Sequence, residues 1–577
     1  MEYPRLYVRQ GSREIIDEFR GYNHNLRIGR GEFYDMKNLT SDYYPVISPR
    51  KSRGRFPGVE EAVQGMVSLN GLCYVAGGKL YYGEKDGAWQ VAEMHLSEGE
   101  KQLIAFGAYI IVMPDKRWLN TVDGETGLCE IGEAFQGGTG VVWCKADGEV
   151  YETVVDGDTE PENHLQMWVK DGKLLEWNET LQKYTAIEQT YLKVIHGGIG
   201  IPFEEGSRVM FVYGTMNGIA HLCGKERTIW AKDRDWIVVE GNMPYIRAEG
   251  DTQFVVEAKM PLMDFVFEHE NRLWGCRYGL NNSGEFVNEI YASKLGDFKS
   301  WNSFKGVSTD SYIASCGTDG PWTGAIKALG HPLFFKENYL HKVYGSYPAN
   351  YQIQVMECRG VREGCHKSMV TVNEVLYYLS RSGVCAYDGS LPACISDALG
   401  NRIFRDAVAG RLGNKYYISM KDGESVHLFA YDTRMRLWHR EDHTDAEQFC
   451  TAGDSLCYTN RGVKGIYAVG SGEAYEGRVE WSCETGVIGA SDPDHKYISR
   501  INLRMEADFG TEINFFAQYD SVGSWVHIGT FAGRSVDSVS VPLRIRRCDH
   551  LRLRFVGKGD AKIYSMTLNM EKGSDIR

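Results

Sequence analysis

The chain has 577 residues, of which 43% are hydrophobic and 24% are charged, and its formal net charge is −13. This length excludes a single compact core, and the acidic balance argues against a protein that binds nucleic acid or acidic membranes over its whole surface. The 65 glycines and the 12% aromatic content favour β-structure with many turns.

The first predicted element is an extended amino-terminal arm, residues 1–60. Residues 1–55 hold 11 Lys/Arg and 7 Asp/Glu, so the arm is basic within an acidic chain. The sequence begins without the apolar core of a secretory signal, and no run of 18 apolar residues occurs, so neither export nor membrane anchoring is expected. REIIDEFRG at 13–21 is the one early helix candidate, and residues 29–56 show no regular period.

A hairpin phrase rich in Tyr, Phe and Ile then recurs through residues 61–139 and 259–472. Most neighbouring copies are about 40 residues apart, with some four short strands per copy, which is the pattern of a β-propeller blade. We therefore predict an all-β fold with a propeller of about six to eight blades. Unrelated hairpins in β-sandwiches are the alternative interpretation. The copies align on Leu72, Ile110, Leu273, Leu333, Leu376, Tyr416 and Leu456.

Two further β-regions complete the predicted domain organisation. The interval between the second and third copies is far too long for one blade, and residues 140–258 alternate at period two, so they are predicted to be an inserted β-rich domain. After Gly470 the repeat stops. Alternating apolar and polar residues, such as Leu551, Leu553 and Phe555 against Arg552 and Arg554, predict a carboxy-terminal β-sandwich over 473–577.

The sequence offers little chemistry. Phosphate-binding glycine loops, serine-hydrolase elbows and zinc-protease motifs are all missing, so we expect no catalytic residues, no cofactor and no metal. HREDH (439–443) could hold a metal, but solvated turn residues are the better interpretation, and DGDTEPE (156–162) is interpreted as an acidic turn. The 14 cysteines form no C-x-x-C pair, which favours buried free thiols over disulfides or zinc ligands.

Two carbohydrate functions remain as alternatives. The first is a propeller glycoside hydrolase, although QYDSVGSW (518–525) matches the turn boxes of such propellers only poorly, and spacing alone places no carboxylate pair. The second is a glycan-binding protein whose terminal sandwich uses Trp481 or Trp525 as a sugar platform. Core packing is the more common role for an aromatic residue on a strand.

Several phrases together resemble a protein of tailed phages and prophages. They are EFYDMKNLTSDYYPVISPRKSRG (32–54), NEIYASKLGDFKSWNSF (288–304), TDGPWTGAIKALGHPLFFKENYLHKVYG (318–345) and SRSGVCAYDGSLPACISDALG (380–400). More distantly, residues 262–304 resemble the tail nozzle, or tail tubular protein B, and the packaged-DNA stabilisation proteins. The resemblance implies a non-enzymatic virion subunit, made in the host cytoplasm and placed in the tail or neck.

The same resemblance implies partners. A ring of identical copies, commonly six, would contact portal and adaptor proteins, surround the DNA channel, retain the packaged genome and guide its ejection, with transient non-specific contact to double-stranded DNA. The arm residues then have two interpretations. They are part of a strap that closes the propeller ring, or they face a neighbouring subunit or passing DNA. The basic residues concerned are Arg50, Lys51, Arg53 and Arg55.

Overall fold

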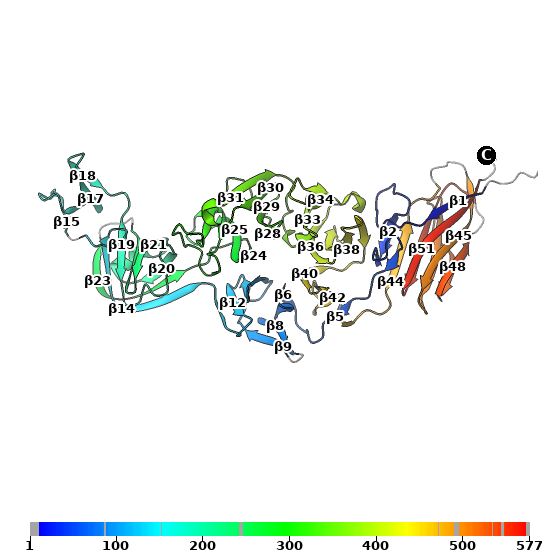
Figure 1. Ribbon diagram of the computed structural model, residues 1–577, viewed down its shortest axis with the longest axis horizontal. Coiled ribbons are helices and arrows are strands. Elements are labelled where there is room, and N and C mark those ends of the chain that lie inside the picture. Colours follow the sequence, from blue (N-terminus) through cyan, green and yellow to red (C-terminus); the bar gives the residue numbers. More distant parts are fainter. Residues whose placement is uncertain are drawn as a thin grey trace, which may run out of the picture. The chain divides into compact units, whose positions relative to one another are not determined.

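The computed structural model describes residues 11–85, 88–151, 153–241, 246–470, 472–489, 495–532, 535–543 and 547–572. The chain divides into two compact units, the first formed by residues 1–100 with 357–577 and the second by residues 101–356. Strands make up almost all of the regular secondary structure in both units, which confirms the prediction of an all-β chain (Figure 1). In the described residues no helix is long and apolar enough to cross a membrane.

Within its described residues, the first unit contains four antiparallel sheets in which consecutive strands are neighbours. Their first strands contact one another in the order β32, β36, β40, β6. The strands are β6 (Val63–Ser68), β7 (Leu72–Ala76), β8 (Lys79–Lys85) and β9 (Ala88–Glu93); β32 (Val370–Val372), β33 (Val375–Ser380), β34 (Gly383–Tyr387) and β35 (Ala393–Cys394); β36 (Arg405–Leu412), β37 (Lys415–Asp422), β38 (Ser425–Asp432) and β39 (Leu437–Arg440); β40 (Ala446–Ala452), β41 (Ser455–Asn460), β42 (Tyr467–Val469), β5 (Gly54–Arg55) and β43 (Glu473–Ala474).

The described residues of the second unit include three sheets of the same kind, whose first strands contact in the order β10, β24, β28. Their strands are β10 (Gln102–Phe106), β11 (Tyr109–Met113), β12 (Arg117–Asn120) and β13 (Thr126–Leu128); β24 (Phe265–His269), β25 (Arg272–Leu280), β26 (Phe286–Ala292) and β27 (Tyr312–Ser315); β28 (Gly324–Ala328), β29 (His331–Lys336), β30 (Tyr339–Tyr344) and β31 (Gln352–Glu357).

Every residue that anchors the repeat is buried, and each lies on the second strand of one of these sheets. The buried faces are continuous across neighbouring sheets. For example, Leu456 of β41 packs in one cluster with Tyr417 and Ala430 of the preceding sheet. Burying aromatic and aliphatic faces between successive sheets is the reason why the hairpin phrase recurs.

Between β13 and β24 the chain forms a closed barrel and a small sheet. The long strands β14 and β23 pair from Ile131↔Ala258 onward, so the barrel begins nine residues before the predicted start of the inserted domain. The barrel strands are β14 (Ile131–Cys144), β19 (Tyr191–Ile195), β20 (Arg208–Gly214), β21 (Glu226–Asp233), β22 (Trp236–Glu240) and β23 (Arg247–Ala258), with helix α1 (Asn217–Leu222) between β20 and β21; the small sheet is β15 (Val154–Asp156), β16 (Met167–Lys170), β17 (Lys173–Asn178) and β18 (Lys183–Ala186).

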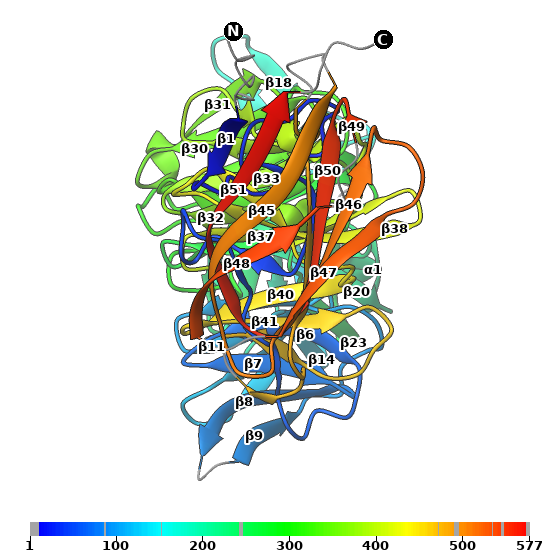
Figure 2. The same cartoon turned by 90° about the vertical axis from the view of Figure 1, so that its right-hand side faces the viewer.

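The carboxy-terminal region contributes to two five-stranded sheets, seen face-on in Figure 2, and both also contain strands from the amino terminus. One sheet holds β1 (Gly11–Ile16), β51 (Ala561–Lys572), β45 (Lys496–Ala507), β48 (Ser535–Pro542) and β49 (Arg547–Cys548). The other holds β2 (Phe33–Lys37), β44 (Glu480–Thr485), β50 (Leu551–Lys558), β46 (Glu512–Tyr519) and β47 (Val526–Ala532). A two-stranded ladder of β3 (Leu39–Thr40) and β4 (Ser48–Pro49) follows β2.

Two predictions about the amino terminus are wrong. Residues 13–21 are not a helix, because Ile15 and Ile16 belong to β1 and pair with Thr567 and Met566 of β51. The described part of the predicted arm, residues 11–60, is also not one extended arm, because β1 and β2 lie inside the terminal sheets and β5 lies inside the sheet of β40 to β42. A polar segment without its own period obtains its structure from distant strands, and that pairing leaves no local signal.

Candidate functional site

A buried cluster of five charged groups connects the amino-terminal segment to the sheets of the first unit. Arg53 contacts Glu441 at 2.6 Å and Asp442 at 2.9 Å, and Arg50 contacts Glu476 at 2.7 Å. Arg50 follows β4 and Arg53 precedes β5, whereas the acids follow β39 and β43. The side chains of Arg50, Arg53 and Glu441 are all at most 6% exposed, so solvent screens these contacts weakly.

The arginines favour the ionised forms of Asp442 and Glu476. Burial opposes the charge of Asp442, but Arg53 together with the side chain and backbone of Thr444 outweighs burial and lowers the pKa of this carboxyl group. Burial likewise opposes the charge of Glu476, yet its hydrogen bond to Arg50 and the charge of Arg50 lower its pKa. This cluster of ion pairs, here called the charged lock, therefore joins segments that are about 400 residues apart in the sequence.

The four basic residues of the arm have different surroundings. Arg50 and Arg53 are buried against acids of their own chain, so they do not face a neighbouring subunit or DNA. Arg55 lies in β5, where its backbone pairs with Tyr467 and Glu473. Lys51 is the exposed member of the group.

The prediction that HREDH forms solvated turn residues is also wrong. His439 and Glu441 are each 3% exposed, and Asp442 belongs to the charged lock. The partners of these acids lie near residue 50, so their burial could not be found from local spacing. The described residues hold no group of three His, Cys, Asp or Glu side chains arranged to bind a metal ion.

Lys51 lines three neighbouring clefts of the first unit. Their volumes are about 610, 670 and 180 Å³. In the 670 Å³ cleft two of the acids already have partners: Asp42 contacts Lys415 at 2.6 Å, and Asp432 accepts a hydrogen bond of 2.5 Å from Ser41. A ligand there would have to compete with these contacts, which makes the other two clefts the better candidates.

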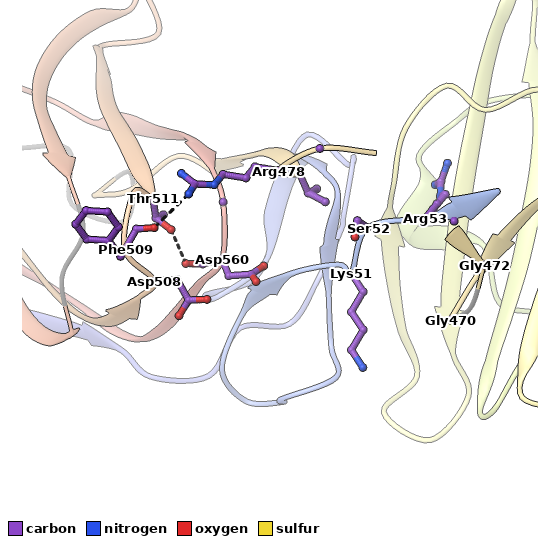
Figure 3. A pocket seen from close by; sticks show the side chains of 14 residues that line it. Lys51, Ser52, Arg53, Gly470, Gly472, Arg478, Asp508, Phe509, Thr511 and Asp560 are labelled. Carbon is purple, nitrogen blue, oxygen red and sulfur yellow. Dashed lines mark hydrogen bonds between the residues drawn. The ribbon is translucent and has the colours of Figure 1, made fainter. Parts of the chain in front are cut away.

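The 610 Å³ cleft, here called the Phe509 cleft, combines a bare aromatic ring with charged groups (Figure 3). Phe509 is 79% exposed, unlike almost every other phenylalanine of the first unit. Its loop is held in place because Arg478 Nη1 donates a hydrogen bond of 2.6 Å to the carbonyl oxygen of Gly510. Lys51 lies on the opposite side of the cleft. A ring this exposed gains contact area only when a partner covers it.

Two carboxylates lie beside this ring, at adjoining strand ends. Asp508 follows β45 and Asp560 precedes β51, and the backbone N–H of Asp508 donates to the carbonyl oxygen of Asp560 at 3.1 Å. Thr511 fixes the pair, because its N–H donates to Asp508 at 3.0 Å and its hydroxyl donates to the Asp560 carbonyl at 2.9 Å. Residues opposite each other on antiparallel strands have Cβ atoms about 4.5–5.5 Å apart, so the side chains of Asp508 and Asp560 start from neighbouring backbone positions.

The same two carboxylates line the 180 Å³ cleft, which has an aromatic ring of its own. Tyr43 is 51% exposed there, with the Lys562 ammonium 4.8 Å from its ring centre. Glu506, the next acid on this side, is already occupied by the Tyr564 hydroxyl at 2.8 Å. Asp508 and Asp560 are thus flanked by one exposed aromatic residue in each cleft.

The two tryptophans proposed as sugar platforms are less exposed than Phe509 and Tyr43. Trp481 is 2% exposed and donates to the Gly559 carbonyl at 2.9 Å, so it is a core residue. Trp525 is half-buried, and the Arg554 guanidinium lies 4.1 Å from its ring centre. Phe509 was missed by sequence reasoning, and the available signal was its place in a turn, Asp508 to Gly510, where a large apolar residue has no core to enter.

No family model and no curated protein sequence matches the chain. Among solved structures, an exo-β-1,3-galactanase from Phanerochaete chrysosporium with galactose matches at 9% identity, covering 52% of this chain and 94% of that one, with a TM-score of 0.20. An engineered GH43 glycoside hydrolase with endo-xylanase and exo-arabinofuranosidase activity matches at 7% identity, covering 54% and 100%, with a TM-score of 0.20.

The prediction of a non-enzymatic virion subunit finds no support among these matches, because the matching solved structures are glycoside hydrolases. They transfer no residue roles, since identities of 7–10% and TM-scores of 0.19–0.20 are too low to align individual side chains. The roles of residues in this chain therefore rest on its own geometry.

Proposed function

We propose that the chain is a carbohydrate-binding β-propeller protein that holds a glycan in the Phe509 cleft. The observation that carries this proposal is the 79% exposed ring of Phe509 beside the adjacent carboxylates of Asp508 and Asp560, in a cleft of about 610 Å³. That volume is within the range of pockets that enclose small ligands.

The aromatic ring and the carboxylates suit the apolar and the polar parts of a sugar. The C–H face of a pyranose is apolar and covers an aromatic ring, while its hydroxyl groups donate to carboxylates. Lys51 and the backbone of Gly470 and Gly472 line the far wall and add donors for ring or hydroxyl oxygens. Tyr43, in the neighbouring cleft, would contact a further sugar of a longer chain.

The repeated antiparallel sheets support the propeller part of this proposal: the described residues form four in the first unit and three in the second. They number within the six to eight blades predicted from the repeat, and β5 adds an amino-terminal strand to the sheet of β40 to β42, as a strap would. The resemblance to tailed-phage proteins stays a prediction, and it suggests bacterial surface glycans as the polymer to test first.

Glycan binding can be tested with one matched pair of variants. Phe509→Ala should weaken binding about 10- to 100-fold, because burying a phenylalanine side chain contributes about 1.5–3 kcal/mol. Phe286→Ala removes another ring, 64% exposed and in the other unit, and should bind like the parent chain. The measurement is a glycan array followed by calorimetric titration of the best ligand. Absence of any glycan ligand for the full chain, or equal loss in both variants, would contradict the proposal.

Hydrolysis is the second candidate function, favoured by the opposite backbone positions of Asp508 and Asp560 at adjoining strand ends. Retaining glycoside hydrolases hold their two carboxyl groups about 5–5.5 Å apart, which opposite positions at strand ends allow. If the chain cleaves the glycan it binds, Asp508→Asn and Asp560→Asn should each lower the cleavage rate at least 100-fold and leave glycan binding within a few-fold. Binding without release of reducing ends would restrict the function to recognition.

A further inference from the structure

Two pairs of cysteines lie directly opposite each other on neighbouring strands of the first unit. Cys385 of β34 is the register partner of Cys394 of β35, and Cys450 of β40 is the partner of Cys457 of β41. All 14 cysteines carry free thiols in this structure. Opposite positions place both thiols of a pair on the same face of the sheet.

The two pairs differ in their place in the hydrogen-bond ladder. Ile395 N–H donates to the Val384 carbonyl at 2.9 Å, so Cys385 and Cys394 form the adjacent pair without mutual hydrogen bonds. In such pairs the Cα atoms are about 4.5 Å apart and the Cβ atoms come closest, near the roughly 3.5–4.5 Å that a disulfide needs.

The second pair is less suitable. The two-residue turn at Gly453 and Asp454 makes Ala452 and Ser455 a hydrogen-bonded pair, and alternation then makes Cys450 and Cys457 hydrogen-bonded as well. Their Cα atoms are about 5.5 Å apart, which separates the Cβ atoms further. Cys457 is also fully buried, whereas β35 is an edge strand and Cys394 is partly exposed.

The thiols of Cys385 and Cys394 have distinct surroundings. Cys394 Sγ lies 3.4 Å from Ser396 Oγ and is accessible from the sheet edge. Cys385 Sγ is buried and donates to Ser380 Oγ at 3.3 Å, and its burial raises its pKa. An oxidant therefore reaches Cys394 first, and Cys385 is placed to react with the oxidised sulfur.

We propose that Cys385 and Cys394 form a reversible disulfide when the protein meets a peroxide. The Cys394 thiolate attacks one peroxide oxygen, which gives a sulfenic acid and releases the other oxygen as water after protonation. The Cys385 thiol then attacks this sulfur, the S–S bond forms, and the hydroxyl group leaves as a second water. The two thiols together lose two electrons and two protons, and hydrogen peroxide is reduced to two waters.

The disulfide would stiffen the attachment of the amino-terminal segment. The residues directly after Cys394 hold this segment, because His24 N–H donates to the Ala398 carbonyl at 2.8 Å and Asn25 Nδ2 donates to the Asp397 carbonyl at 2.9 Å. Trp438 Nε1 donates to the Ile395 carbonyl at 2.8 Å. Bonding β35 covalently to β34 restrains this whole run of contacts.

Peptide mapping tests the proposal, because each pair lies in one tryptic peptide without other cysteines: residues 382–402 and residues 441–461. The folded full chain is treated with stoichiometric hydrogen peroxide, alkylated under denaturing conditions and digested. Peptide 382–402 should lose two hydrogens and carry no alkyl label, and added thiol should restore two labels. Peptide 441–461 should keep two labels throughout.

Two further measurements complete the test. In Cys394→Ser, peptide 382–402 should keep its single label on Cys385, since a buried thiol without its partner is not oxidised. Hydrogen exchange of residues 395–399 should slow at least several-fold on oxidation of the parent chain and stay unchanged in the variant. The proposal is overturned if peptide 382–402 keeps both labels, or if both peptides are oxidised at the same rate.

Discussion

Lowering the pH from 7 to 4 should destabilise the first unit by about 6 kcal/mol and the second by about 3 kcal/mol, from buried histidines alone. Burial, together with Arg402 and Arg440, lowers the pKa of His427 to about 4. Burial and Lys415 lower the pKa of His439 to about 3. In the second unit, burial and Lys336 lower the pKa of His341 to about 4.

The direction of this effect follows from proton binding. Unfolding returns each imidazole to an ordinary pKa of about 6.5, so the unfolded chain binds more protons at any pH between that value and the lowered one. The contribution of these neutral histidines to the free energy of unfolding is therefore fully present above about pH 6.5, and it falls as the pH drops towards 4. At pH 5, unfolding of the first unit should take up about two protons at these residues, a slope of roughly 2–3 kcal/mol per pH unit.

Urea titrations between pH 7 and 4, followed by hydrogen exchange in each unit, measure this slope. His427→Gln should remove about one proton of uptake, even if it lowers stability at neutral pH. His221→Gln, which removes an imidazole of the second unit, should leave the slope of the first unit unchanged. Equal slopes in the parent chain and His427→Gln would show that His427 is charged in the folded protein.

Arg53→Met should lower the free energy of unfolding of the first unit by about 3–5 kcal/mol, because it leaves the buried Glu441 and Asp442 without their closest cation. Urea denaturation at pH 7 measures this loss. Lys51→Ala, an exposed position two residues away, should change stability by less than about 0.5 kcal/mol.

A double variant separates the ion pair from packing. Arg53→Met combined with Glu441→Leu replaces both partners by apolar side chains and should recover part of the loss, because no unpaired carboxylate remains at position 441. If the double variant is less stable than the sum of the two single changes predicts, the cluster is held together by packing and not by charge.

The sequence predicted what local periodicity encodes. The anchors Leu72 to Leu456 locate seven second strands because a blade-like hairpin carries its signal within about 20 residues. Pairing between distant parts of the chain could not be predicted from local periodicity. Ile15 was assigned to a helix because its strand partner, Thr567, lies far away in the sequence. Glu441 was assigned to a solvated turn because its ion-pair partner, Arg53, is also distant. Phe509 was missed for a related reason, since its exposure depends on the absence of a core beside its turn.

The shared sheets at the two ends of the chain have a consequence for biosynthesis. β1 and β2 are translated hundreds of residues before their pairing partners, because β1 lies against β51 and β2 against β44. These early segments stay unpartnered while hundreds of residues are being made. If translation stops before β44, β1 and β2 never obtain their pairing partners. Folding of β1 and β2 therefore depends on synthesis of the later strands. Fragments that end before residue 480 should be strong substrates for chaperones and proteases.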